Sequence, residues 1–313
     1  MKAVLVGAGG FGYRWYGTLR EFHGELQLAV VDIDEGKRSL IEQDGVPFYT
    51  SAEVAIAQEK PDLLINVTPP DVHTRINHLA FDHKLPVFCE KPIADNYSDA
   101  NGVVERAERE GIPFMIGENY RAFIFVRRMK QLIRRGAIGD IQVIHCEFNR
   151  YVNHPDRELA QRRSRLEAGP VHHFDLLRYL TGREVERLFA SHTHSLCIWM
   201  GMQDGITASF RSLRSRGKLT DWAGNWRIDG TLGSLELIDN QVLLTVDGAT
   251  TEANDDFKEV YGPGPFGEFL LSIALKREAE TSGRDYLNNQ ALAHYTMESI
   301  RTRQVIDTSS SWR

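Results

Sequence analysis

Residues 1–12 read MKAVLVGAGGFG, a short apolar run followed at once by a group of glycines. The run Ala3–Val6 is apolar at every position, which is typical of a strand buried on both faces of a sheet. Among the glycines, Gly7 suits a tight turn, Gly9 a close approach of the backbone to a pyrophosphate, and Gly12 close packing of helix on strand. Because a helical pattern follows, this spacing predicts a dinucleotide site at the start of a parallel sheet.

An acid follows the second apolar run at the distance that such a site requires. Residues 26–31 are largely apolar and end at Asp32, which lies 20 positions after Gly12. A carboxylate here can accept hydrogen bonds from ribose hydroxyls, and its charge repels a 2′-phosphate, so we expect NAD rather than NADP. Lys37 and Arg38 lie nearby in the sequence and weaken that preference. The alternative is that the glycines only form turns and Asp32 only caps the next segment.

Strand and helix patterns alternate through the first 120 residues. We expect further strands at residues 46–49, 63–67, 86–89 and 114–116, with helices between them. The alternation predicts a doubly wound parallel sheet, that is, a Rossmann domain over residues 1–120. Ligands of such sheets bind beyond the carboxyl ends of the strands. The residues expected at that edge are Gly7, Gly9, Gly10, Phe11, Gly12, Asp32, Thr68, Pro69, Glu90 and Lys91.

Residues 121–313 have a different pattern. Strands are expected at 141–148, 188–194, 206–213, 226–229, 234–238 and 242–246, and helices at 123–135, 266–276 and 286–304. This order predicts an α+β domain with an open, mainly antiparallel sheet, joined to the first domain near residues 119–123. One face of an open sheet must be covered, so we expect a homo-oligomer, either a dimer or a tetramer.

Composition limits the classes of partner. The chain has 313 residues and a net charge of −6, which gives no reason to expect nucleic acid or an anionic membrane. No apolar run is long enough to span a bilayer. The three cysteines are widely spaced, which is typical of a reducing cytoplasm and predicts neither disulfides nor a metal site. We therefore expect a cytoplasmic protein that acts on a small molecule.

Two adjacent histidines open a helical pattern in RLEAGPVHHFDLLRYLTG, residues 165–182. On a helix His172 and Asp175 share one face, whereas His173 points about 100° away and is expected to be a packing or hydrogen-bonding residue. From the pattern alone, both histidines are better explained as structural residues.

Five motifs in order extend the argument over nearly the whole chain. They are GAGGFG with Asp32, TPPDVH at 68–73, CEKPIAD at 89–95, HHFDLLRYLTG at 172–182 and WRIDGTLGSLEL at 226–237. Together they resemble the glucose–fructose oxidoreductase and inositol dehydrogenase family (Gfo/Idh/MocA). The resemblance implies hydride transfer between NAD(P) and a secondary carbinol of a sugar, an inositol or a related polyol.

The resemblance also implies roles for particular residues. The lysine of the EKP motif, Lys91, would be catalytic, and His172 would assist it. His73 and Glu90 would lie on the cofactor side. Possible substrate contacts are Asp175, Tyr120, Arg121, Glu167 and Asn149.

One position departs from the family pattern D-x-x-x-H-x-x-D. Its earlier aspartate falls on Ala168, which has no side-chain acid. Glu167 could take its place, because Gly169 and Pro170 leave the local backbone free to be non-helical. Otherwise the proton chemistry rests on Lys91 and His172 alone.

Two further functions stay open. One is a redox-neutral sugar lyase or isomerase in which NAD is reduced only transiently. The other is a non-catalytic NAD-binding regulator, which the missing acid at Ala168 favours and which Lys91 and His172 oppose.

Overall fold

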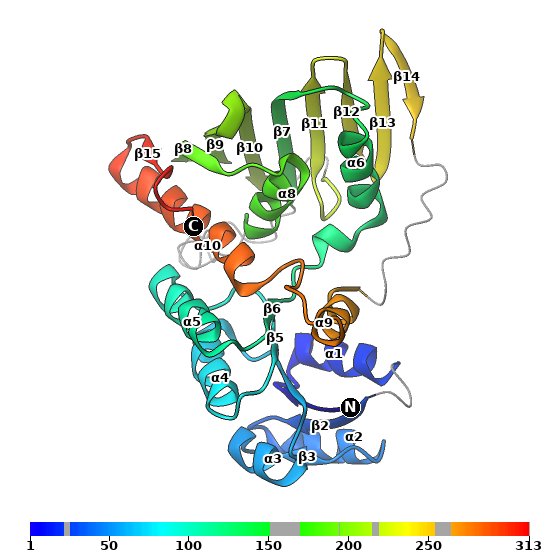
Figure 1. The fold of residues 1–313 in the computed structure, drawn as a ribbon, viewed down its shortest axis with the longest axis vertical. Coiled ribbons are helices and arrows are strands. Elements are labelled where there is room, and N and C mark those ends of the chain that lie inside the picture. Colours follow the sequence, from blue (N-terminus) through cyan, green and yellow to red (C-terminus); the bar gives the residue numbers. More distant parts are fainter. Residues whose placement is uncertain (22–25, 151–169, 194, 215–218, 254–263, 313) are drawn as a thin grey trace. The chain divides into compact units, whose positions relative to one another are not determined.

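The structure is a computed structural model that describes residues 1–21, 26–150, 170–193, 195–214, 219–253 and 264–312. The chain forms two compact units. The first unit is Met1–Glu118 with the described part of residues 262–290, and the second is residues 119–261 with 291–313. Figure 1 labels the elements of both. Among the described residues, no helix is long and apolar enough to cross a membrane.

The first unit contains a six-stranded parallel sheet in the order β3-β2-β1-β4-β5-β6. Its strands are β1 (Lys2–Val6), β2 (Gln27–Val31), β3 (Phe48–Tyr49), β4 (Leu63–Asn66), β5 (Val87–Cys89) and β6 (Phe114–Ile116). The connecting helices are α1 (Gly10–Arg20), η1 (Glu35–Lys37), α2 (Arg38–Glu42), α3 (Ala52–Glu59), α4 (Pro70–Asp82) and α5 (Tyr97–Glu110). This strand order is that of a Rossmann fold, so the predicted fold class is confirmed for this half.

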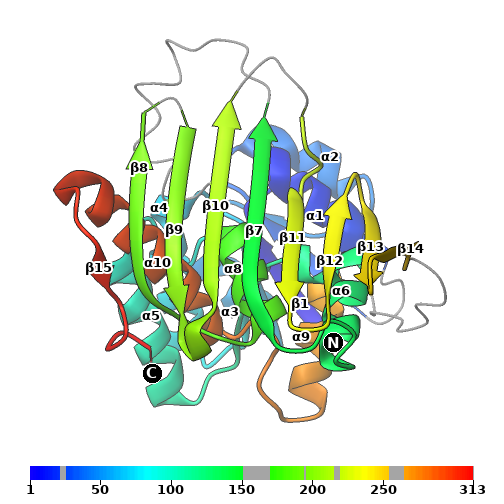
Figure 2. The same ribbon diagram turned by 90° about the horizontal axis from the view of Figure 1, so that it is seen from above.

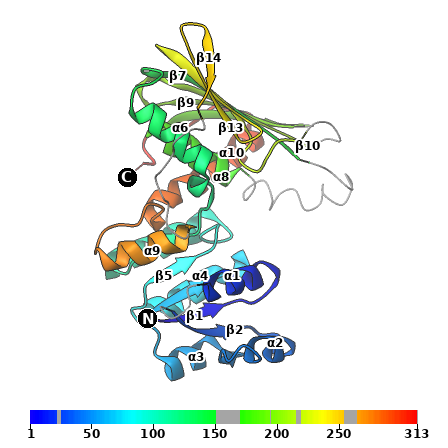
Figure 3. The same ribbon diagram turned by 90° about the vertical axis from the view of Figure 1, so that its right-hand side faces the viewer.

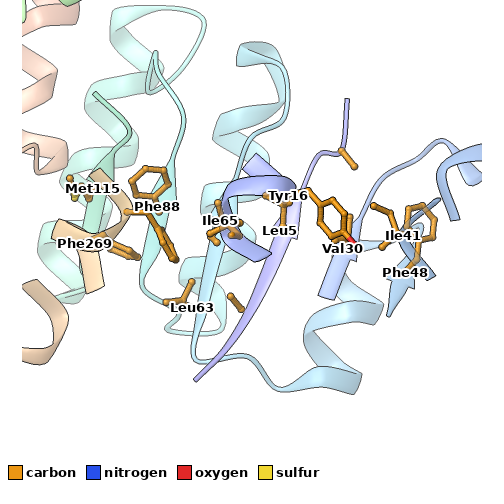
Figure 4. Packing of buried hydrophobic residues seen from close by; sticks show 14 residues of the cluster. Leu5, Tyr16, Val30, Ile41, Phe48, Leu63, Ile65, Phe88, Met115 and Phe269 are labelled. Atoms are coloured by element: carbon orange, nitrogen blue, oxygen red, sulfur yellow. The ribbon is translucent and has the colours of Figure 1, made fainter. Parts of the chain in front are cut away.

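Buried apolar side chains explain why these segments form a sheet. The central strands are buried almost throughout, as parallel strands covered by helices on both faces must be. Figure 4 shows the core running along the sheet, from Ile41 and Phe48 at one end to Phe88 and Phe269 at the other. The Phe88 ring packs edge-on against Trp15 of α1 at 5.0 Å between ring centroids.

Helix α9 (Gly264–Ala274) contributes to this core although it comes late in the sequence. Its Phe266 and Phe269 are fully buried and lie 5.6 and 5.8 Å from the Phe88 ring. The predicted division into residues 1–120 and 121–313 places this segment in the second domain. In the structure it packs with the first unit.

The second unit contains a nine-stranded sheet in the order β14-β13-β12-β11-β7-β10-β9-β8-β15, seen face-on in Figure 2. Its strands are β7 (Ile141–Arg150), β8 (Val185–His192), β9 (Ser195–Met202), β10 (Thr207–Arg214), β11 (Asn225–Gly230), β12 (Gly233–Ile238), β13 (Gln241–Val246), β14 (Ala249–Glu252) and β15 (Ile306–Asp307). All neighbouring pairs are antiparallel except β7 and β10. The predicted open, mainly antiparallel sheet is confirmed.

Helices lie on one face of this sheet. Helix α6 (Ile124–Arg134) packs against β13, and α8 (Val171–Thr181) packs against β7. Figure 3 shows the sheet nearly edge-on, with α6 and α8 on the same side. A last helix, α10 (Gly283–Thr302), begins in the first unit and ends in the second.

Candidate active site

The glycine loop after β1 has the backbone geometry that its sequence predicts. Gly7 has φ +99°, and a Cβ there would lie 2.8 Å from the Val67 carbonyl oxygen. A Cβ on Gly12 would lie 2.2 Å from the Gly7 carbonyl oxygen. Larger residues are therefore excluded at both positions by backbone that cannot move aside.

The same loop leaves open space in front of the first helix. A Cβ on Gly9 or Gly10 would meet nothing within 4 Å. Helix α1 begins at Gly10, and its N-cap, Gly9, has no side chain to accept hydrogen bonds from the first turn. Its N-terminal N–H groups are thus available to an anion, because a helix N-terminus attracts negative charge.

A cavity of about 740 Å³ adjoins this helix end. Its walls come from the carboxyl ends of β1, β2, β3 and β4 and from the segments that follow them, including the starts of α1, α3 and α4. The predicted cofactor residues Gly7, Gly9, Gly10, Phe11, Gly12, Asp32, Thr68 and Pro69 all line it. This placement is the one that the Rossmann topology predicts for a dinucleotide.

Asp32 directly follows β2 at the edge of this cavity, with its carboxylate only 9% exposed. Its Oδ2 accepts a hydrogen bond from the Ala8 N–H at 2.7 Å and lies 2.8 Å from Lys37 Nζ, while Oδ1 accepts from the Asp34 N–H at 2.9 Å. Burial alone would raise the pKa of Asp32, but the hydrogen bonds from Lys37, Asp34 and Ala8 outweigh it and lower that pKa. The group is therefore a charged acceptor near neutral pH.

The two basic residues near Asp32 differ in their contacts. Lys37 reaches the Asp32 carboxylate directly. Arg38 instead pairs with Glu35 and Glu42 and donates to the Phe48 carbonyl. Of the two, only Lys37 is therefore placed to weaken the effect of Asp32 on a 2′-phosphate.

His73, which we predicted on the cofactor side, is buried beside the cavity. Its ring is 1% exposed, and it is absent from the cavity wall that its neighbours Val72 and Ile76 help to form. Both ring nitrogens face main-chain carbonyl oxygens at 2.7 Å. The ring is thus enclosed by protein, and its contact with a cofactor stays a prediction.

Glu90 and Lys91 begin the turn after β5. Glu90 is 6% exposed, and its carboxylate accepts hydrogen bonds from Trp15 Nε1 at 2.7 Å and from the Lys91 N–H at 3.1 Å. Lys91 is half-buried and precedes Pro92 through a cis peptide bond. Glu90 therefore shapes the turn, and Lys91 retains an accessible side chain.

In the second unit, His172 is half-buried in the first turn of α8. Its ring stacks on that of Tyr120, with centroids 4.0 Å apart and planes 6° from parallel. Tyr120 belongs to the short helix η2 (Tyr120–Ala122) and is 6% exposed. One face of the His172 ring is therefore fixed by the tyrosine.

Arg121 and Asp175 form a buried ion pair between η2 and α8. The guanidinium donates two hydrogen bonds to the carboxylate, Nε to Oδ2 at 2.7 Å and Nη2 to Oδ1 at 2.6 Å. Asp175 has no exposed surface and Arg121 is 5% exposed. We predicted both as possible substrate contacts, and that role stays a prediction; in the structure they join η2, which carries Tyr120, to α8, which carries His172. The sequence could not have shown this pairing, because 54 positions separate its members.

His173 is buried and packs among aromatic rings. Its ring lies 4.3 Å from Phe148 and 5.2 Å from Phe210 between centroids. It is thus part of the core between α8 and the sheet.

Of the two other predicted substrate contacts, Asn149 is described by the structure and Glu167 is not. Asn149 is 8% exposed; its side-chain amide donates to the Glu147 carboxylate, and its main-chain carbonyl accepts from the Thr220 N–H. Glu167 lies outside the described residues, together with Ala168, so its substitution for the missing acid stays a prediction.

The parallel sheet, its glycine loop and the acid that follows β2 are the features of an NAD-binding Rossmann domain. Residues 1–118 match the model of the Gfo/Idh/MocA oxidoreductase family, NAD-binding Rossmann fold, and residues 126–236 match its C-terminal domain. The chain belongs to the Gfo/Idh/MocA family.

Relatives of known activity are distant. A 2,7-anhydro-N-acetylneuraminate hydratase of Mediterraneibacter gnavus is 26% identical, over 83% of this chain and 77% of that protein. A D-apiose dehydrogenase of Paraburkholderia graminis is also 26% identical, over 99% of this chain and 90% of that protein. An oxidoreductase from Agrobacterium radiobacter, solved with NAD+, L-tartaric acid and magnesium, has a TM-score of 0.86 at 21% identity and covers 99% of both chains. This last likeness shows the fold.

Proposed function

We propose that the protein transfers hydride between NAD and a secondary carbinol of a sugar, an inositol or a related polyol. The observation that carries this proposal is the position of Lys91, in a braced turn directly after β5, on a chain that belongs to this oxidoreductase family. The D-apiose dehydrogenase that matches 99% of the chain supports a sugar-like substrate.

The residues of the first unit fit NAD. The open space at Gly9 and Gly10, with the start of α1, suits a pyrophosphate. Oδ1 of Asp32 accepts one hydrogen bond among the described residues, so it keeps capacity for a ribose hydroxyl. A negative charge there disfavours NADP, and for this reason we propose NAD as the cofactor.

The bound cofactor supplies the hydride acceptor, and the protein must handle the alcohol proton. We propose that Nζ of Lys91 takes this proton and that His172 assists by hydrogen bonding, with its ring orientation set by Tyr120. Both assignments follow the family resemblance together with the local geometry of each residue.

A panel of polyols, aldoses and sugar acids, assayed with NAD and NADP separately, tests this function. We expect reduced nicotinamide to form with at least one compound, at least tenfold more efficiently with NAD. Lys91→Met should lower kcat by roughly 100-fold to 10,000-fold, the usual contribution of a positioned acid or base. Lys60→Met, an exposed lysine at the end of α3, is the matched control and should leave kcat unchanged. Full activity of Lys91→Met would refute the proton-transfer role.

A second function has one observation in its favour. The Mediterraneibacter gnavus relative is named a hydratase. Adding water to a substrate involves no net oxidation, so this relative favours a redox-neutral reaction in which NAD is reduced only transiently. If the protein works in this way, it should retain NAD through purification and convert substrate without net formation of reduced nicotinamide. Product analysis by mass spectrometry separates this outcome from the first.

A further inference from the structure

The turn that carries Lys91 is held by side chains from several elements of the first unit. Trp15 of α1 bonds Glu90, which accepts the Lys91 N–H. Gln290 of α10 donates its amide to the Ala94 carbonyl at 2.7 Å. These hydrogen bonds limit movement of the main chain just before Lys91, at its own N–H, and three residues after it, at the Ala94 carbonyl.

His73 provides the contact immediately after the lysine. Its Nδ1 lies 2.7 Å from the carbonyl oxygen of Pro92, the residue that follows Lys91. Its Nε2 lies 2.7 Å from the carbonyl oxygen of Thr68, which lines the nucleotide cavity. One buried ring on α4 thus joins the loop after β4 to the turn after β5.

The protonation state of this ring determines how many of the contacts are hydrogen bonds. A neutral imidazole has one N–H donor, whereas the imidazolium has two. The pKa of His73 is lowered overall, because burial disfavours the charged ring. The carbonyls of Pro92 and Thr68 and the charge of Asp71 oppose this change, whereas the charge of Lys91 adds to it. Each ring nitrogen that carries a proton donates it to the carbonyl oxygen that it faces, so a neutral ring donates to one of the two carbonyls and an imidazolium to both.

We propose that His73 is a positioning residue for Lys91: through the Pro92 carbonyl, it holds the main chain that presents the lysine. This inference rests on the proposed function, in which Lys91 carries the alcohol proton. It assigns His73 a role in catalysis without contact with substrate or cofactor, and it predicts that the Pro92 bond matters more than the Thr68 bond.

Two conservative variants separate the two bonds. The side-chain amide nitrogen of His73→Asn corresponds to Nδ1 and keeps a donor for Pro92, whereas that of His73→Gln corresponds to Nε2 and keeps one for Thr68. His73→Phe keeps a ring of similar volume but can donate a hydrogen bond to neither carbonyl. His78→Phe is the matched control, since His78 is a half-buried histidine on the same helix that packs near Phe81 and Arg106.

Two readouts are compared across these variants of the full chain. The first is kcat with the best substrate of the panel, alongside the Kd for NAD from calorimetry. We expect kcat to fall roughly 100-fold in His73→Phe and His73→Gln, the effect of a misplaced catalytic group, and to be largely retained in His73→Asn. The Kd for NAD should change little, and His78→Phe should behave as wild type.

The second readout is hydrogen–deuterium exchange of the peptide that spans residues 89–96, and it needs no substrate. Exchange should be roughly tenfold faster in His73→Phe and His73→Gln than in wild type and His73→Asn, because the turn opens more often. Equal exchange in all four proteins would overturn the proposal. If wild type oxidises nothing in the panel, the proposed function fails, while the exchange data still decide whether His73 holds the turn.

Discussion

The Asp32 carboxylate combines three donors with a place on the wall of the nucleotide cavity. Because Lys37 neutralises part of its charge, the preference for NAD depends on a balance between two side chains. The sequence placed Asp32 correctly at the cavity edge, since the end of a buried strand is easily recognised. It could not tell which of Lys37 and Arg38 would reach the carboxylate.

Replacing this acid tests its role directly. Asp32→Ser should raise the Kd for NAD roughly tenfold, which corresponds to about 1.4 kcal/mol, and should strengthen NADP binding because repulsion of the 2′-phosphate is lost. Isothermal titration calorimetry with both nucleotides measures the change. Asp82→Ser, an acid at the exposed end of α4, controls for the altered net charge. An unchanged ratio of the two affinities would rule out Asp32 as the discriminating group.

His73 also predicts how stability depends on pH. Burial lowers its pKa from the ordinary 6.5 in the folded protein, so below about 6.5 the unfolded chain binds the proton more readily. This contribution to stability is complete above pH 6.5 and is lost as the pH falls towards the lowered pKa. Urea unfolding midpoints should therefore drop between neutral pH and about pH 5, with a smaller drop in His73→Phe. An equally steep drop in the variant would assign the effect to other groups.

Among the elements, the turn between β1 and α1 contains one glycine that the fold requires and another that we expect to matter only for NAD binding. Gly12 is needed by the fold, because a Cβ would overlap the Gly7 carbonyl, whereas Gly9 has open space around it. Gly12→Ala should therefore lower the thermal midpoint by several degrees. Gly9→Ala should leave the midpoint nearly unchanged and weaken NAD binding. Calorimetry of both variants checks this, and equal effects on stability would contradict the assignment.

The buried pair between η2 and α8 gives a second prediction for an element. Asp175→Ala leaves the Arg121 guanidinium buried without its carboxylate, which typically costs about 3–5 kcal/mol of unfolding free energy. The double variant Arg121→Met with Asp175→Leu should lose much less, because no charge is left unpaired. Urea denaturation of the three proteins measures both values. A double variant that loses as much unfolding free energy as Asp175→Ala, or more, would contradict this account of the pair.

At the scale of the whole molecule, regular patterns were predictable and long-range packing was not. Alternating strands and helices correctly predicted the parallel sheet, because each element has a local signature. Strand β9, SLCIWMGM, was missed since its apolar and small residues give only a weak alternation. Helix α9 was expected in the second domain, and only the burial of Phe266 and Phe269 against Phe88 shows where it belongs.

The same limit applies to the candidate site. Gly7 and Asp32 follow β1 and β2 directly, and Lys91 lies two residues after β5, so the topology alone places them at one sheet edge. Pro92, which faces His73, and Arg121, which pairs with Asp175, lie 19 and 54 positions away in the sequence, so these contacts could be recognised only in the folded chain.

The most direct test of the central claim follows one hydrogen atom. The best polyol of the panel is labelled with deuterium at its reacting carbinol carbon and incubated with NAD and the protein, and the reduced nicotinamide is weighed by mass spectrometry. We predict that the nucleotide gains the deuterium in wild type and that its rate of labelling falls sharply in Lys91→Met. Substrate conversion with no label in the nucleotide pool would contradict a net hydride transfer to NAD.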